Sequence, residues 1–334
     1  FAVFSLLVHV PSDAFAADTW TAATTTNVGT THLHEVSMSD ASNGVAVGAA
    51  GTIVFTSDGG DTWTIPTTTN VGTTSMNGVS MSDASNGVAV GSDGTIVYTS
   101  DGGDTWTAAT TTNVGANNVR GVSMSDASNG VAVGFDATIV FTTDGGDTWT
   151  AATTTNVGSA IMNEVSMSDA SNGVAVGGTG EIVYTTNGGV DWTAATTTNV
   201  GGTLMNGVSM SDASNGVAVG SDGTIVFTSD GGDTWTIPTT TNVGTTSMNG
   251  VSMSDASNGV AVGSDGTIVY TSDGGDTWTA ATTTNVGTTH LRGVSMSDAS
   301  NGVAVGDSGT IVFTALVSSE DSTTGEEKES SSDT

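Results

Sequence analysis

The sequence of 334 residues contains no cysteine and only three basic residues, Arg120, Arg292 and Lys328. Without cysteine the chain can form neither a disulfide nor a catalytic thiolate. Without a basic patch it cannot neutralise phosphates, so nucleic acids and anionic membrane surfaces are excluded as direct partners. The 34 acidic residues bring the net charge to −31, which suits a saline or cation-rich setting.

Helix-forming residues are also scarce, since Leu, Glu and Lys are few while Gly and Thr occur throughout. What the chain has instead is a repeat, which is the first feature to establish in such a sequence. Residues 51–115 recur without change at 223–287. Tryptophan recurs every 43 residues, at Trp20, Trp63, Trp106, Trp149, Trp192, Trp235 and Trp278.

Each 43-residue unit is predicted to form four short strands. In the first unit we expect strands at 33–38, 45–47 and 52–56, and a fourth that begins near Trp63. The second and third strands are apolar at consecutive positions, which indicates that both faces of the sheet are covered. Four strands in a unit of this length are typical of a β-propeller blade.

The two ends of the repeat array predict a closed ring. A tryptophan-bearing fourth strand at Trp20 precedes the first complete unit, whereas the last unit ends at Phe313-Thr314 without one. The N-terminal strand can therefore pair into the last blade and remove the exposed sheet edges. The sequence thus predicts an all-β fold, a seven-bladed β-propeller over residues 17–317 that is closed by its N-terminal strand, and we expect a monomer.

The segments on either side of the propeller differ from it in composition. Residues 1–16 are mostly apolar and end in Ala14-Phe15-Ala16, the small-x-small pattern of a signal-peptidase site. We expect them to be the C-terminal part of an export signal peptide; a first buried strand is the alternative. Residues 318–334 are rich in Ser, Glu and Asp and are expected to form an acidic disordered tail.

A turn motif precedes most of the tryptophans. Residues 56–63, Thr-Ser-Asp-Gly-Gly-Asp-Thr-Trp, fit the pattern Ser/Thr-x-Asp-x-Gly-x-Thr-Trp. They resemble the Asp-box (BNR) repeat of sialidases, sortilin-type receptors and related propellers. An Asp side chain in such a motif accepts hydrogen bonds from nearby backbone amides and fixes the turn. The motif returns at Asp101, Asp144, Asp230 and Asp273, and in degenerate form at Asn187.

A longer phrase carries a second resemblance. The segments 86–91 (Asn-Gly-Val-Ala-Val-Gly), 94–99 (Gly-Thr-Ile-Val-Tyr-Thr) and 101–106 (Asp-Gly-Gly-Asp-Thr-Trp) are similar to the repeat of the photosystem II stability/assembly factor family. The resemblance covers nearly all of residues 17–314. It implies a non-catalytic seven-bladed propeller of the thylakoid lumen that docks photosystem II subunits during assembly. A secreted or cell-surface adhesion propeller and an Asp-box glycoside hydrolase remain the alternatives.

Catalytic and metal sites find little support in the residue pattern. Sialidase chemistry needs an arginine triad, a tyrosine nucleophile and acid/base carboxylates, and the propeller has two arginines. The repeated acids, such as Asp40 and Asp58, recur at equivalent turns and are expected to be structural. His32 and His34 have no Cys or His cluster around them, so we expect neither metal nor cofactor. The tyrosines are expected to pack in place of phenylalanine, at Tyr98, Tyr184 and Tyr270.

Binding information is expected where the repeats differ, in the six residues that lead into the inner strand. In a propeller this segment comes close to the central channel, on the face that also carries the loops between the second and third strands. Only divergent residues can orient an asymmetric partner, although neutral drift among loops is the alternative. We expect the two arginines, in the third and seventh units, to be separate anchors for carboxylates. The predicted protein-binding residues are His32, His34, Glu35, Asn118, Arg120, Asn163, Glu164, His290 and Arg292.

Overall fold

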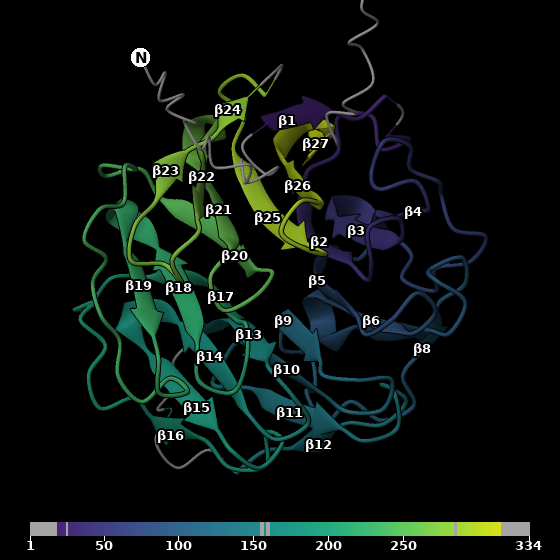
Figure 1. Cartoon of the computed structure of the whole chain (residues 1–334). Helices are drawn as coiled ribbons and strands as arrows, with labels where there is room; N and C mark the ends of the chain where they lie inside the picture. Colours follow the sequence, from purple (N-terminus) through teal and green to yellow (C-terminus); the bar gives the residue numbers. More distant parts are fainter. Residues whose placement is uncertain (1–18, 25, 154–156, 158–160, 284–285, 315–334) are drawn as a thin grey trace, which may run out of the picture.

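Seven small antiparallel sheets stand around a central axis, one for each unit of the repeat (Figure 1). We refer to them as blades 1 to 7 in the order of their inner strands along the chain. The predicted signal segment 1–16 and tail 318–334 lie outside the described part of the chain. The computed structural model describes residues 19–24, 26–153, 157, 161–283 and 286–314.

Three strands of each blade follow one another along the chain from the axis outward. The inner strands are β2 (Leu33–Met38), β5 (Met76–Met81), β9 (Val119–Met124), β13 (Met162–Met167), β17 (Met205–Met210), β20 (Met248–Met253) and β25 (Leu291–Met296). The second strands are β3 (Gly44–Gly48), β6 (Gly87–Gly91), β10 (Gly130–Gly134), β14 (Gly173–Gly177), β18 (Gly216–Gly220), β21 (Gly259–Gly263) and β26 (Gly302–Gly306). The third strands are β4 (Ile53–Thr56), β7 (Ile96–Thr99), β11 (Ile139–Thr142), β15 (Ile182–Thr185), β19 (Ile225–Thr228), β22 (Ile268–Thr271) and β27 (Ile311–Thr314).

Short 3₁₀ turns connect the second and third strands in all blades except blade 3. They are η2 (Ala49–Gly51), η3 (Ser92–Gly94), η4 (Gly178–Gly180), η5 (Ser221–Gly223), η6 (Ser264–Gly266) and η7 (Asp307–Gly309). None of the described helices is long and apolar enough to cross a bilayer.

The fourth, outermost strand is short, and in two blades it is reduced to a single bridge. It forms β8 (Thr107–Ala108), β12 (Thr150–Ala151), β16 (Thr193–Ala194) and β23 (Thr279–Ala280). In blade 2 the next residue, Ala109, extends the ladder by donating its N–H to Ile96 O over 3.0 Å. Blades 1 and 5 have Pro66 and Pro238 at that place, and proline has no N–H to donate. These blades keep only the bridges Phe55 to Thr64 and Phe227 to Thr236.

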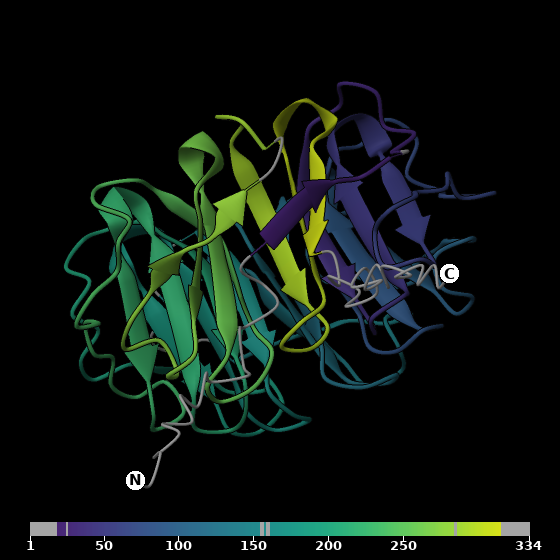
Figure 2. The same ribbon diagram turned by 45° about the horizontal axis from the view of Figure 1, so that its top comes forward.

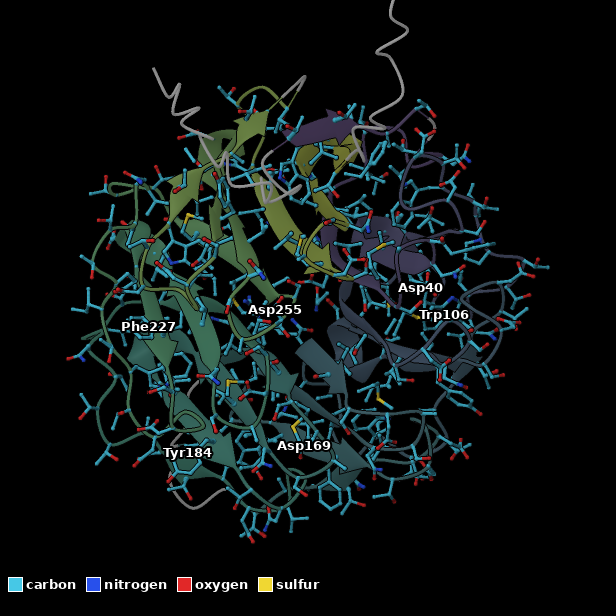
Figure 3. The ribbon with its side chains drawn as sticks, viewed as in Figure 1. Asp40, Trp106, Asp169, Tyr184, Phe227 and Asp255 are labelled. Atoms are coloured by element: carbon cyan, nitrogen blue, oxygen red, sulfur yellow. The ribbon has the colours of Figure 1, made fainter. Side chains whose placement is uncertain are left out.

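Both faces of each sheet are buried against neighbouring blades, as the consecutive apolar residues predicted. In the second strand of blade 1, Val45 and Val47 pack on blade 2, whereas Ala46 points the other way and packs with residues of blade 7. A tryptophan is fully buried in each of these interfaces, for example Trp106 between blades 1 and 2 (Figure 3). Burial of so large a ring between two sheets accounts for its recurrence in every unit.

The N-terminal strand closes the ring, which confirms the prediction from the ends of the array. Strand β1 (Thr19–Ala22) runs antiparallel to β27, with Trp20 opposite Thr314. On its other side β1 pairs in parallel with β24 (Thr282–Thr283), a contact that the sequence did not predict (Figure 2). The last blade is therefore assembled from both ends of the described chain.

Candidate functional site

The inner strands surround a cavity of about 530 Å³ on the axis of the ring. Every blade contributes to its wall, so the wall can be described by position along the inner strand, counted from its first residue. In β2, position 2 is His34, position 3 is Glu35 and position 5 is Ser37. The residue immediately before the inner strand, His32 in blade 1, is called the rim residue.

Position 5 is a serine in every blade, and these serines tie the inner strands together. Each serine Oγ accepts a hydrogen bond from the backbone N–H of the last residue of the next inner strand, at 2.9–3.0 Å. The series runs from Ser37 and Met81 in blades 1 and 2 round to Ser295 and Met38, which join blade 7 to blade 1. The channel wall is thus a continuous ring of side-chain to backbone hydrogen bonds.

Position 2 forms a second, incomplete ring. Its asparagines donate from Nδ2 to the first carbonyl of the next inner strand, at 2.7–2.8 Å, in blades 2, 4, 5 and 6. In blade 1, His34 Nδ1 makes the equivalent contact with Met76 O at 2.8 Å. Burial lowers the pKa of His34, so the ring is neutral near pH 7 and Nδ1–H can act as the donor. Position 2 of blades 3 and 7 is an arginine, which makes different contacts.

The two arginines line the same cavity, and each is held by a side chain of its surroundings. Arg120 Nη1 donates to Asn163 Oδ1 over 2.8 Å, and its guanidinium lies 5.0 Å from the centre of the Phe135 ring. Arg292 Nε donates to Asp307 Oδ1 over 2.5 Å. Both side chains belong to the wall of one cavity, on blades 3 and 7, and both already have partners within the chain. That they act as two separate anchors for carboxylates of a partner stays a prediction.

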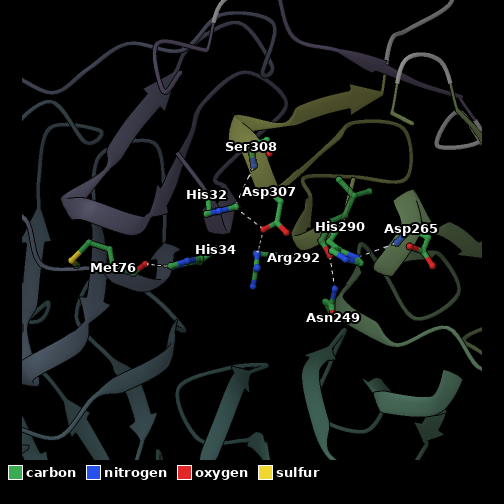
Figure 4. Close-up of polar contacts among 10 residues, drawn as sticks. His32, His34, Met76, Asn249, Asp265, His290, Arg292, Asp307 and Ser308 are labelled. Atoms are coloured by element: carbon green, nitrogen blue, oxygen red, sulfur yellow. Dashed lines mark hydrogen bonds and ion pairs between the residues drawn. The ribbon is translucent and has the colours of Figure 1, made fainter. Parts of the chain in front are cut away.

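A polar cluster occupies the seam between blades 7 and 1 (Figure 4). Asp307 on η7 contacts Arg292 and also lies 2.9 Å from His32 Nδ1. Burial alone would raise the pKa of Asp307, but the hydrogen bond and charge of Arg292, with His32, lower it. On blade 7 the other rim histidine, His290, accepts a hydrogen bond from Asp265 N over 3.2 Å. Arg292, Asp307 and His32 therefore form one connected cluster at this seam.

Position 3 is glycine in five blades and glutamate in two, Glu35 in blade 1 and Glu164 in blade 4. Each glutamate side chain lies against the glycine at position 3 of the preceding blade. A Cβ added to Gly293 of blade 7, for example, would lie 2.5 Å from Glu35 Oε1. Burial raises the pKa of Glu35 to about 8. Burial likewise raises the pKa of Glu164 well above its usual range, with repulsion by Glu35 as a second cause. The two carboxyl groups thus affect one another through the channel.

The predicted binding residues lie at the same end of the channel, although most are not in loops. His34, Glu35, Arg120, Asn163, Glu164 and Arg292 are within the inner strands and, together with Asn118, line the cavity. His32 and His290 are rim residues outside the cavity lining. Whether these residues bind a partner remains a prediction.

Two residues of the channel opening were missed by the sequence analysis. The rim residues of blades 4 and 5 are Ile161 and Leu204, with exposed fractions of 38% and 43%. Every other blade has histidine, serine or asparagine at this place. An alignment of the units would have revealed them, because an exposed apolar residue at a polar repeat position is unusual. The opening therefore has two exposed apolar residues on neighbouring blades, 4 and 5, whereas the cluster of Asp307, Arg292 and His32 lies at the seam of blades 7 and 1.

The Asp boxes lie at the other ends of the strands and fix the turns there by hydrogen bonds, as predicted. Asp58 Oδ1 accepts hydrogen bonds from Thr62 N and Thr56 Oγ1, both at 2.9 Å. In the degenerate box Asn187 Oδ1 takes the same role and accepts from Asp191 N over 3.0 Å. Within the described residues, no three His, Asp or Glu side chains are grouped so that they could hold a metal ion.

Comparison with known proteins gives one sequence family and many propellers. A family profile described as photosynthesis system II assembly factor YCF48 matches residues 13–110 and 68–206, which is more than half of the chain. No curated protein sequence is similar enough to count as a match. At the identities given below, the structural matches show the fold alone.

Three of the similar structures are described here. A structure of YCF48 bound to a D1 peptide has a TM-score of 0.70 and 19% identity, with 89% of this chain and 97% of that chain covered. YCF48 from Cyanidioschyzon merolae has a TM-score of 0.68 and 18% identity, with 88% and 98% covered. The GH74 enzyme of Niastella koreensis has a TM-score of 0.63 and 17% identity, with 86% and 43% covered.

Proposed function

Because the chain belongs to the photosynthesis system II assembly factor YCF48 family, we propose that it is a non-catalytic scaffold that docks a subunit of photosystem II at the opening of its channel. The solved YCF48 complex contains a D1 peptide, and D1 is the partner that we propose for this chain. This function requires the propeller to reach the thylakoid lumen, in keeping with the export signal expected at residues 1–16.

The observation that carries the proposal is the asymmetry of the channel opening. Near-identical blades present near-identical surfaces, so a partner can be held in one orientation only where blades differ. The differences gather at the rim residues and at positions 2 and 3 of the inner strands, as the pairs Ile161 and Leu204, Glu35 and Glu164, and His32 with Asp307 illustrate. By contrast, the turns between the inner and second strands and most Asp boxes, which lie on the opposite face, repeat the same residues.

The pair of glutamates argues against a glycosidase, the class to which the Niastella enzyme belongs. Glycoside hydrolysis uses one protonated carboxyl group and one ionised carboxylate, so the two pKa values must be pushed apart. Here burial raises the pKa of both Glu35 and Glu164. Neither group is then a good base or nucleophile near neutral pH, which supports a binding role for the cavity.

Capture of photosystem II subunits tests the proposal. The tagged full-length chain is incubated with detergent-solubilised thylakoid membranes, and retained D1 is quantified by immunoblotting. The test variant replaces Arg120 and Arg292 by the asparagine found at position 2 of blades 2, 4, 5 and 6. The control variant is Asp58→Asn, which introduces the residue of the degenerate box on the opposite face.

We expect the wild type and the Asp58→Asn variant to retain D1, and the double arginine variant to retain about tenfold less, as for loss of one strong polar contact. If the wild type retains no photosystem II subunit, the proposal is wrong. Equal retention by the arginine variant, with loss in Asp58→Asn, would place the docking site on the opposite face.

A further inference from the structure

Two partly buried carboxyl groups face the channel, and no counter-charge among the described residues pairs with them. Glu35 and Glu164 are the acidic members of position 3, on blades 1 and 4. In each, Oε1 accepts a hydrogen bond from the backbone N–H of the following valine over 3.0 Å. Among the described residues, neither glutamate forms an ion pair and neither Oε2 has a hydrogen-bond partner. Both glutamates are partly buried and line the cavity, so an oxygen that has no partner within the described chain can be reached by a group that enters the channel.

The arginines and His34, all in the described part of the chain, do not neutralise the glutamates. Arg292 is paired with Asp307, and Arg120 contacts Asn163 and the ring of Phe135. His34 donates toward a backbone carbonyl, and burial favours its neutral form. With the channel empty, the raised pKa values keep these carboxyl groups protonated near neutral pH. A cation that enters through the channel opening favours their ionised form, so its binding is coupled to release of protons.

An apolar surface lies beside one of these carboxylates. Ile161 precedes Glu164 by three residues on the edge of blade 4, and Leu204 is the rim residue of blade 5. Between them, η4 has Gly178 where other blades have a side chain, and a Cβ placed there would be 3.9 Å from Leu204 Cδ1. The missing side chain leaves Leu204 uncovered, so the rim offers an apolar contact next to a buried acid.

We propose that the channel receives a lysine or arginine side chain of the docked partner between Glu35 and Glu164, while a nearby apolar residue of the same partner segment packs on Ile161 and Leu204. This inference rests on the proposed function and specifies what the docked segment must contain. The apolar residue lies within about three residues of the basic one, because Ile161 and Glu164 are three residues apart along extended chain with about 3.3 Å per residue.

A basic side chain fits this site better than the other cations. A cavity of about 530 Å³ is far larger than a bare ion needs, and it admits a four-carbon stem with its charged end. Ammonium and guanidinium groups carry several donors, which can reach two carboxylates on different blades. The net charge of −31 also attracts a basic segment toward the propeller.

Two synthetic peptides test the inference by isothermal titration calorimetry with the full-length chain. The first is acetyl-Gly-Leu-Gly-Lys-Gly-Leu-Gly-amide, and the second has norleucine in place of lysine. We expect the wild type to bind the lysine peptide at least about tenfold more tightly, as for a charge-assisted contact. In Glu35→Gln/Glu164→Gln this preference disappears. In Asp222→Asn it persists, because that exposed acid on η5 is outside the cavity lining.

A second pair of variants tests the apolar contact. Ile161→Ser and Leu204→Ser introduce the rim residue of blades 2 and 6, and they should weaken both peptides to the same extent while leaving the preference for lysine unchanged. Glutamine keeps the size of each side chain and the oxygen that accepts from the following backbone N–H, so the double glutamine variant should fold.

The inference is overturned if the wild type binds both peptides equally, or if the lysine preference survives in the double glutamine variant. Calcium chloride, titrated in place of peptide, should give no binding that the glutamine substitutions abolish; such binding would assign the pair to a metal ion instead. If D1 is still captured while the lysine preference is absent, this inference fails and the proposed function stands.

Discussion

The backbone N–H of Met38 donates a hydrogen bond to Ser295 Oγ over 2.9 Å, although the two residues are 257 positions apart in the chain. The same bond, at 2.9–3.0 Å, joins every other pair of neighbouring inner strands. The seam where the two ends of the array meet therefore has the same inner wall as the covalently continuous joints. Only the outer edge of blade 7 differs, since β1 supplies its fourth strand.

The ring of serine hydrogen bonds predicts that removing one bond lowers the free energy of unfolding equally at the seam and elsewhere in the ring. Ser295→Ala leaves the amide of Met38 without its partner, and Ser166→Ala does the same to Met210. Each should lower the free energy of unfolding by about 1–3 kcal/mol, the cost of an unsatisfied buried amide. Urea unfolding followed by tryptophan fluorescence measures both values. A much smaller loss for Ser295→Ala would mean that the seam is already open in solution.

Deletion of residues 17–27 should open the ring. It removes β1, with the fully buried Trp20, and exposes the edge of β27. Loss of a packed tryptophan alone costs about 3–5 kcal/mol, so a large fall in melting temperature is expected. The matched control is deletion of residues 1–16, which should leave the melting temperature unchanged. Equal melting temperatures for the two deletions would contradict closure by β1.

The stability that the Asp box provides should depend on the acceptor oxygen of its Asp side chain rather than on the negative charge. Asp58→Ala removes the acceptor for Thr62 N and Thr56 Oγ1 and should cost about 1–3 kcal/mol of unfolding free energy. Asp58→Asn should cost much less, because Asn187 already performs this role in blade 4. Chemical denaturation compares the two variants. D1 capture should be equal in both, and loss of capture with full stability would show that Asp58 belongs to the binding site.

Glu35 should make stability depend on pH. Its pKa is about 8 in the folded protein against 4.5 ordinarily, so between these values the folded state keeps a proton that the unfolded state has released. The contribution of Glu35 to stability therefore falls as pH rises, by about 1.4 kcal/mol for each pH unit in this window, and Glu164, whose pKa burial also raises, adds a dependence of the same sign. Glu35→Gln removes this slope and should be more stable than the wild type above about pH 5, with the difference growing toward pH 8.

Urea unfolding of both proteins at about pH 5, 7 and 9 provides the comparison. Asp222→Asn, which removes an exposed charge, should keep the wild-type slope. His34 acts in the opposite sense, because its lowered pKa removes stability as pH falls below its ordinary value. It is present in all three proteins and cancels in the comparison. Parallel curves for the wild type and Glu35→Gln would refute the prediction.

The fold was predictable because its determinants are local and repeated. Trp63 and its equivalents mark the period, Val45-Ala46-Val47 shows that both faces are covered, and Trp20 before the first unit reveals the closure. The weak fourth strands were less predictable. The length of these strands depends on one backbone N–H, which Pro66 lacks and Ala109 has. The pairing of β1 with β24 was not predictable either, because the threonines of β24 have no distinctive pattern.

The site was predictable only as a region. Differences between units pointed to the inner end of the blades, where Glu35, Arg120 and Glu164 do line one cavity. The partners of the arginines were not predictable, because Arg120 contacts Asn163 of the next blade and Arg292 contacts Asp307 on the η7 turn of its own blade, and neither pairing follows from sequence spacing. Ile161 and Leu204 were overlooked because they look like ordinary core residues when the units are not aligned.

Closure by β1 also bears on how such a gene can change. The strand pairing that closes the ring joins β1 to β27, and the residues of these two strands do not depend on how many units lie between them. Unequal crossing-over between neighbouring units would therefore leave both ends of the seam intact. Recombination between the identical segments 51–115 and 223–287 would instead delete four units and leave three. Each blade of a seven-bladed ring occupies about 51° of the circle, so three such blades cannot close a ring. The product of this deletion is therefore not expected to fold as a propeller.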